Sequence, residues 1–141
     1  IRPGNFIFYD LQQYKLGVCN LSDIATSVAC PIVSIHRDRN EMVIYGGAVH
    51  FSKDTFIEGD KNIYGYVVIL SDKGWIFPNS KMLLTKVSQE HGTISVSPDA
   101  LLEFKTGDFI GVLPAHACLT ANLMKGYVDP DGVRYDHLAG K

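Results

Sequence analysis

The sequence lacks a long apolar run, a stripe of one charge sign and an even set of cysteines. No apolar run approaches the roughly 18 residues of a membrane span, and nothing resembles a signal peptide, so we expect no membrane segment. A net charge of -2 without a basic stripe argues against a nucleic-acid partner. Cys19, Cys30 and Cys118 are odd in number and irregularly spaced, which indicates reduced thiols of a cytoplasmic protein rather than disulfides.

Two further features are missing. The stretch "YGGAVHFSKD" holds a Gly-Gly pair but neither of the glycine-rich patterns that cradle phosphates, which argues against nucleotide binding. The chain also starts at Ile1 without methionine and continues directly into "RPGNFIFYD", which we interpret as a strand. We therefore expect residues 1–141 to be one domain cut from a longer protein, with its function shared with the missing part.

Short strand-like segments dominate the chain. With 141 residues, 46% of them apolar, the chain is long enough for one domain with a core. Turn-forming stretches such as "HRDRN", "GDKN" and "SDKG" separate the segments, and "DPDG" predicts a hairpin turn within 127–135. The pattern predicts a mainly β domain, a compact barrel or sandwich, with one or two short helices near "LSDIATS" and "SPDALLEF". The other expected strands are 5–10, 24–36 (with an edge or bulge at Pro31), 41–47, 64–70, 81–88, 92–97 and 108–114.

The stretch "PAHACLTANL" carries the most chemistry. On an extended chain the side chains of His116, Cys118, Thr120 and Asn122 share one face, and the apolar residues take the other. Imidazole and thiolate together favour zinc among the common divalent ions. Two ligands are half of a tetrahedral site, so His91, or less favourably the histidine of "GGAVHFS", is a candidate neighbour.

Four alternatives remain open for this stretch. On a helix the pair would lie about 200° apart and could not hold one ion, although Leu119, Leu123 and Tyr127 have helical spacing. A mixed case is extended through Cys118 and then helical. The pair could also be a buried histidine and an inert thiol, or Cys118 could be a nucleophile activated by another histidine, although no oxyanion hole is recognisable.

Several stretches together resemble a known family. They are "RPGNFIFYDLQQYKLGVC", "VIYGGAVHFSKD", "SQEHG", "GDFIGVLPAHACLTANL" and the closing "YDHLAG". In this order they are similar to the C-terminal domain of the metal-dependent D-serine dehydratase and D-threonine aldolase family, fold-type III pyridoxal-phosphate enzymes related to alanine racemase. The H-x-C-x-x-x-N-L piece is the most specific part. D-threonine aldolases tend to carry Asp where this chain has Cys118, so the cysteine resembles the D-serine dehydratase branch.

The resemblance implies a division of labour. An N-terminal TIM-type barrel, absent from this chain, would bind pyridoxal phosphate through a lysine, and the C-terminal β-domain would supply the metal ligands His116 and Cys118. The metal, zinc or else manganese, would act as a Lewis acid on the hydroxyl of a small D-amino acid, with water and substrate filling its other positions. A homodimer is typical of the fold type. Neither Lys53 nor Lys86 matches the cofactor lysine, so we expect no catalytic residue within this chain.

Other residues are weaker candidates. His91 could orient a ligand or a water, and Thr120 and Asn122 lie beside the proposed ligands on the extended interpretation. Tyr45, with the two glycines after it, could face the barrel domain or form a plain bulge. The expected function is that of a D-serine dehydratase, which converts D-serine to pyruvate and ammonia. The alternatives are D-threonine aldolase-like cleavage of 3-hydroxy amino acids and a non-catalytic β-barrel binding module.

Overall fold

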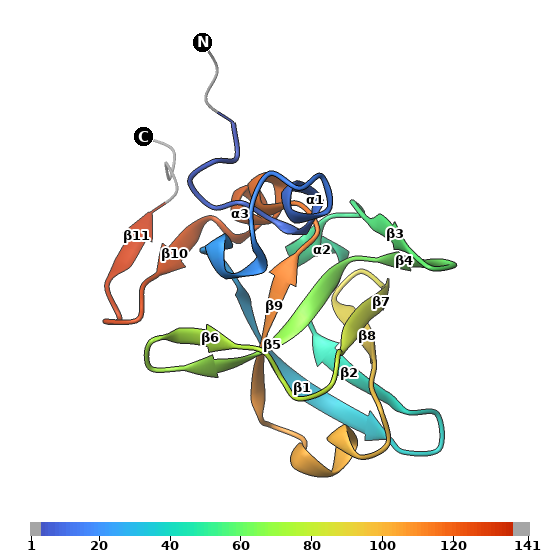
Figure 1. Cartoon of the computed structure of the whole chain (residues 1–141). Coiled ribbons are helices and arrows are strands. Elements are labelled where there is room, and N and C mark those ends of the chain that lie inside the picture. Colours follow the sequence, from blue (N-terminus) through green and yellow to red (C-terminus); the bar gives the residue numbers. More distant parts are fainter. Residues whose placement is uncertain (1–3, 137–141) are drawn as a thin grey trace.

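The chain folds into a closed antiparallel β-barrel. The computed structural model describes residues 4–136, and six strands form a ring in the order β5-β7-β8-β2-β1-β9, with β9 pairing back onto β5 (Figure 1). The barrel confirms the predicted mainly β class. Its strands are β1 (Val28–His36), β2 (Glu41–Tyr45), β5 (Gly65–Ser71), β7 (Leu83–Val87), β8 (His91–Ser95) and β9 (Phe109–Pro114), and β6 (Gly74–Ile76) extends the ring beside β5.

The interior of the barrel is filled with apolar side chains. Along β2, Met42 and Ile44 point inward and are fully buried, while their neighbours are half-buried or exposed. Ile94 on β8 and Ile110 on β9 meet them from other sides of the ring in one apolar cluster. A six-stranded barrel packed in this way leaves no channel, so any functional site of this fold lies at a rim or in a loop.

Three short helices gather at one end of the barrel, at the top of Figure 1. They are α1 (Leu11–Lys15), α2 (Ala48–Phe51) and α3 (Ala117–Met124), and α2 packs against α3. Two hairpins flank this end, β3 (Phe56–Glu58) with β4 (Lys61–Ile63) and β10 (Gly126–Val128) with β11 (Arg134–Asp136). Two 3-10 turns complete the chain, η1 (Leu21–Asp23) and η2 (Ala100–Glu103).

Most predicted strands are present, but the first one is not. Residues 5–8 form a turn rather than a strand, and Asp10 then begins α1, because its carboxylate accepts a hydrogen bond from the amide of Gln13 at 2.9 Å. The other predicted strands differ little: β1 begins at Val28, and its bulge lies between Ile32 and Ser34, just after Pro31. Helices α1 and α2 and strands β3, β4 and β6 were not predicted. The predicted hairpin around "DPDG" and the two short helical turns are confirmed.

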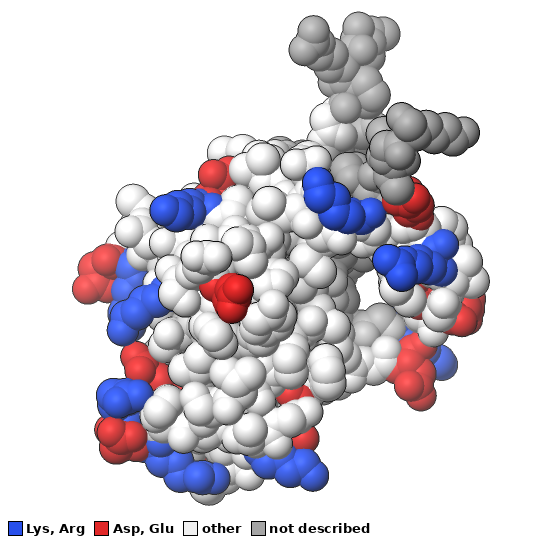
Figure 2. Space-filling model, turned by 180° about the vertical axis from the view of Figure 1, so that it is seen from behind, with Lys and Arg blue, Asp and Glu red and all other residues white. Residues whose placement is uncertain are grey.

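The surface carries charges of both signs. Figure 2 shows lysine, arginine, aspartate and glutamate interspersed over the face seen from behind, without a broad patch of one sign. The three cysteines are free, as expected from their number and spacing. Within the described residues no helix is long and apolar enough to cross a membrane. Residues 2–3 of the strand-like stretch "RPGNFIFYD", and 137–140 of the closing "YDHLAG", lie outside the described part of the chain.

Candidate metal site at the start of α3

His116 lies at the junction of β9 and α3. Its backbone is still extended (φ -134°, ψ 104°), and the helix begins at the next residue, Ala117. The fully extended interpretation of this stretch was therefore wrong, and the mixed alternative is closest, with the change to helix two residues earlier, after His116 rather than after Cys118. The helix forms because Ala117, Thr120 and Ala121 all face the protein interior with helical spacing.

This helix changes which side chains share a face. Thr120 is turned about 200° from Cys118 and is buried, whereas Asn122 follows Cys118 by one helical turn and is exposed, as Cys118 is. Thr120 therefore does not share a face with Cys118, contrary to the extended interpretation, and Asn122 does. Because His116 precedes the helix, the helical separation that would keep it from Cys118 does not apply.

The imidazole of His116 is held by an aspartate from a distant part of the chain. Its Nδ1 lies 2.7 Å from Oδ2 of Asp54, and the two side chains are 31% and 41% exposed. A carboxylate only accepts hydrogen bonds, so Nδ1 carries the hydrogen in this pair. In the neutral ring Nε2 then keeps its lone pair, the form in which a histidine binds a metal. Asp54 was not predicted from the sequence.

The loop that carries Asp54 has an unusual backbone. It follows α2, whose last residue Phe51 is buried. Ser52 then adopts φ 66° and ψ -163°, a region that residues other than glycine rarely enter. The Ser52 hydroxyl accepts a hydrogen bond from the amide of Asp54 at 3.1 Å. The surrounding structure thus holds Asp54 in one place at the cost of local strain.

A second carboxylate, that of Asp10, joins α1 to α3. It is only 1% exposed. One oxygen accepts from the amide of Gln13 at 2.9 Å, and the other accepts from the amide of Ala117 at 2.9 Å and from the side chain of Asn5. Asp10 therefore fixes the first turn of α3, between His116 and Cys118, although it lies more than a hundred residues earlier.

The thiol of Cys118 lies on the first turn of α3. Partial burial and the nearby charge of Asp10 raise its pKa, against a smaller lowering by its own backbone amide. Burial, and then the charge of Cys118, in turn raise the pKa of Tyr127 on β10. The thiol is thus mostly protonated near neutrality, and a metal bound here would have to displace its proton.

The other predicted site residues form a separate group around Tyr45. The Tyr45 ring meets His50 edge-on at a centroid distance of 5.1 Å and His91 at 5.9 Å, because β2 and β8 place Tyr45 and His91 opposite each other. The Nδ1 of His50 accepts a hydrogen bond from the amide of Gly47 at 3.1 Å, and burial lowers the pKa of His50. Both nitrogens of a neutral His50 are therefore engaged or protonated.

Gly47 explains how tightly this group is packed. A Cβ atom there would lie 2.6 Å from the carbonyl oxygen of Gln89 and from the backbone of Glu90 and His91. The glycine therefore lets the start of α2 lie directly on the β7–β8 turn. This is a close backbone approach within the domain, and the possible contact of Tyr45 with a barrel domain stays a prediction.

The described residues hold no larger cluster of ligands. Among residues 4–136, no group of three or more histidine, cysteine, aspartate or glutamate side chains could hold a metal ion. The predicted partnership of His91 with the metal site therefore gains no support from the geometry. What the described residues offer is one imidazole held by a carboxylate and one nearby thiol.

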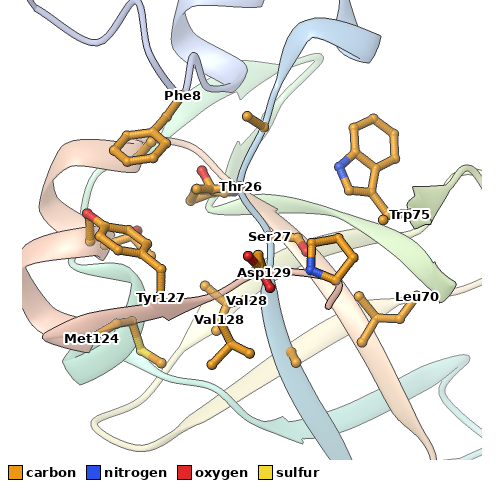
Figure 3. Close-up of a pocket in the computed structure, with 18 of the residues that line it drawn as sticks. Phe8, Thr26, Ser27, Val28, Leu70, Trp75, Met124, Tyr127, Val128 and Asp129 are labelled. Carbon is orange, nitrogen blue, oxygen red and sulfur yellow. The ribbon is translucent and has the colours of Figure 1, made fainter. Parts of the chain in front are cut away.

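A large apolar groove lies on the other side of α3. It has a volume of about 820 Å³ and runs between the barrel, α3 and the β10–β11 hairpin, where Figure 2 shows a hollow. Phe8, stacked on Tyr127 at 5.3 Å, and Trp75 belong to its walls (Figure 3). Thr120 faces this groove, and within the described residues its hydroxyl makes no hydrogen bond.

Comparison with known proteins places the chain in a family. Residues 25–128 match the model of the putative serine dehydratase domain, which is most of the chain. The chain belongs to this family. It is 33% identical over 130 residues to D-serine dehydratase of Dictyostelium discoideum, a match that covers 90% of this chain and 32% of that protein. It thus spans about a third of the length of the curated relatives that it matches.

Solved structures agree with this assignment. D-threo-3-hydroxyaspartate dehydratase from Delftia sp. HT23 superimposes with a TM-score of 0.80 at 27% identity, over 97% of this chain and 38% of that one. One variant of D-threo-3-hydroxyaspartate dehydratase replaces a cysteine by alanine and is described as metal-free. Another replaces by alanine a histidine two positions earlier. The spacing between these two residues is the spacing between His116 and Cys118.

Proposed function

We propose that this chain is the metal-carrying C-terminal domain of a pyridoxal-phosphate-dependent D-amino-acid dehydratase that acts on D-serine or a close relative. One observation carries the proposal: at the start of α3, His116 has Nδ1 engaged by Asp54, and the exposed thiol of Cys118 lies two residues later. In this arrangement the side chains offer one ring nitrogen and one sulfur to an ion.

The donor set fits zinc. Nitrogen and sulfur ligands favour zinc over magnesium or calcium, and a site with few protein ligands leaves positions open for exchange, as in catalytic rather than structural zinc sites. Manganese is the second candidate. The relatives support a metal, because a cysteine-to-alanine variant of D-threo-3-hydroxyaspartate dehydratase is described as metal-free.

Each residue has a proposed role. His116 and Cys118 would hold the ion, and the bound ion would supply a Lewis acid that polarises the hydroxyl of the substrate. Asp10 fixes the backbone between the two ligands, because its carboxylate accepts a hydrogen bond from the amide of Ala117. Asn122, exposed one turn beyond Cys118, would offer its amide to the substrate or to water on the same face. Tyr45 and His91 stay candidates for contact with substrate or with the barrel domain.

The rest of the active site would lie outside this chain. The lysine that binds pyridoxal phosphate, and the base that takes the substrate proton, would belong to an N-terminal TIM-type barrel, and the full-length protein would be a homodimer. The length of the relatives supports this division, since this chain covers about a third of them. The chain alone would bind metal without turning over D-serine.

Metal analysis of the chain, purified without a histidine tag, tests the proposal. We expect zinc to bind to the unsubstituted chain and to be lost in His116→Ala and in Cys118→Ala. Cys19→Ala and His36→Ala are matched controls outside the site and should keep the zinc. An equal zinc content in all five proteins would refute the assignment.

A substrate panel with the full-length protein separates the remaining alternatives. D-serine turnover that a chelator abolishes and zinc restores is the expected result. Cleavage of D-threonine instead would identify an aldolase, and no turnover of D-serine, D-threonine or their L-forms would favour a binding module without chemistry.

A further inference from the structure

We propose that Asp54 is the positioning residue of the metal site, fixing His116 in the one neutral form and orientation in which Nε2 can bind the ion. This inference rests on the proposed metal function and goes beyond it by assigning a residue outside the H-x-C stretch. The basis is the 2.7 Å contact between Nδ1 of His116 and Oδ2 of Asp54.

The chemistry of the contact sets the state of the ring. A neutral imidazole carries one hydrogen, on either nitrogen, and the partner of the other nitrogen decides which. The carboxylate of Asp54 accepts, so the hydrogen stays on Nδ1. The lone pair of Nε2 is then available, and the negative charge behind the ring makes that nitrogen a stronger ligand.

The backbone shows that Asp54 is held there by the fold. Its loop passes through Ser52 in a positive-φ conformation that residues other than glycine rarely adopt, and the Ser52 hydroxyl accepts a hydrogen bond from the amide of Asp54. On the other side of the contact, α2 packs against α3, so the helix that precedes Asp54 lies against the helix that follows His116.

His50 provides the contrast within the same end of the barrel. It too is contacted at Nδ1, but by the amide of Gly47, which donates. The hydrogen of a neutral His50 is therefore on Nε2, and neither nitrogen is free for a metal. Among the imidazoles near the helical end, the partner at Nδ1 distinguishes the one suited to a metal from the one that is not.

Two measurements on the 141-residue chain test the proposal. The first is the hydrogen position on His116, read at mildly alkaline pH by two-bond nitrogen–proton NMR on chain with labelled histidine, with His116→Ala used to assign the signals. We expect the hydrogen on Nδ1, and we expect Asp54→Ala to lose this preference. The second is zinc affinity, measured by competition with a coloured chelator.

The expected effects on zinc follow from the general behaviour of such supporting carboxylates. Asp54→Ala should weaken zinc binding by about 10- to 100-fold. Asp54→Asn keeps an acceptor but not the charge, so its loss should be smaller. Asp60→Asn, at an exposed aspartate of the β3–β4 turn, is the matched control and should bind zinc as the unsubstituted chain does. Thermal melting of each variant verifies that it folds.

The outcomes are distinguishable. A hydrogen on Nε2 of His116 in the unsubstituted chain, or equal zinc affinity of the unsubstituted chain and Asp54→Ala, would overturn the role of Asp54 while leaving the metal site standing. A chain that shows the expected hydrogen on Nδ1 but binds no zinc would overturn the metal function itself, and with it the assignment of Asp54 to that function.

Discussion

His116 and His50 lie at the same end of the barrel, and each is held through Nδ1, but by partners of opposite character. The carboxylate of Asp54 accepts a hydrogen bond from His116, and the amide of Gly47 donates one to His50. His116 is thereby left with a nitrogen that can bind a metal, while His50 becomes part of the packing between α2 and β2. The sequence already favoured His116 through its spacing from Cys118, and the partners at Nδ1 add a physical reason for that preference.

The two groups also differ in how far their partners lie along the chain. His50 is held by an amide three residues before it, within one helical turn. His116 depends on Asp54, 62 residues away, and its helix depends on Asp10, 107 residues from Ala117. The surroundings of His116 thus come from three separate segments of the chain. Substitutions in either distant segment should therefore change the position of its ring.

Among the substitutions considered, replacement of Asp10 should have the largest effect on stability. Asp10→Ala removes the cap of α1 and leaves the buried amide of Ala117 without its acceptor, so we expect a loss of about 3 kcal/mol in the free energy of unfolding. Zinc affinity should fall as well, because the start of α3 is no longer fixed, whereas the contacts of His50 do not involve Asp10.

Denaturant unfolding of Asp10→Ala and Asp23→Ala measures the difference. Asp23 also caps a helical turn, but it is exposed and accepts its hydrogen bonds from Asn20, three residues earlier. Its replacement should cost about 1 kcal/mol or less. Equal losses in the two variants would mean that the link between α1 and α3 contributes nothing.

A substitution at Gly47 tests the packing around His50. The methyl group of Gly47→Ala would lie 2.6 Å from backbone atoms of the β7–β8 turn, which cannot move aside cheaply, so we expect a loss of about 2 kcal/mol in stability. Gly4→Ala, where no atom lies within 4 Å of the new Cβ, is the control and should be nearly neutral. Chemical denaturation of both variants checks the expectation, and a neutral Gly47→Ala would show that α2 does not lie on that turn.

The barrel was predictable because its strands carry their own signal. Segments such as 41–45, 91–95 and 109–114 are short, contain β-branched residues and are bounded by turn residues, and all three are strands in the structure. The turn at 5–8 was missed because "NFIFYD" has the composition of a strand. What decides its structure is the Asp10 carboxylate, which serves α1 and α3 at once, and no local pattern reveals such a double contact.

The candidate site was predictable only in part. His116 and Cys118 could be singled out from their spacing and from the family resemblance, and they remain candidates. Asp54 could not, because an aspartate after a helix is ordinary and its contact with His116 depends on how α2 meets α3. Thr120 was placed on the wrong face because extended parity was assumed where the chain turns helical. His91 was expected near the metal, but its ring lies edge-on to that of Tyr45.

Removal of His50 should leave the metal untouched while costing stability. His50→Ala takes away the acceptor of the Gly47 amide, so we expect a loss of about 1 kcal/mol, with zinc affinity unchanged. Because burial lowers the pKa of His50 in the folded chain, protonation favours the unfolded state, and stability should fall as pH drops below the ordinary value of 6.5. His50→Ala should lose that part of the acid dependence, as urea unfolding between neutral and mildly acidic pH would show. A loss of zinc in this variant would contradict the distinction between the two histidines.

Replacement of Glu58 should have the smallest effect on stability. Its carboxylate is a useful contrast to that of Asp54, because its partners are two lysines and a tyrosine rather than a histidine. Burial opposes its ionisation, but hydrogen bonds from Lys81, Tyr66 and Lys15 outweigh this and lower its pKa to about 2. A lowered carboxyl pKa stabilises the fold above the ordinary value of 4.5, and this stability is lost as pH falls toward about 2. Since the lysines are largely exposed, solvent screening limits the effect to about 0.5 kcal/mol.

Unfolding of Glu58→Gln at neutral and at acid pH isolates this contribution. The variant should be less stable than the unsubstituted chain near neutrality, and the difference should vanish near pH 2. Its zinc affinity should be unchanged, because the cations around Glu58 hold no metal ligand in place. If Glu58→Gln weakened zinc as Asp54→Ala is expected to, the loss would follow from any missing carboxylate at this end of the barrel, and the specific support of His116 by Asp54 would have to be given up.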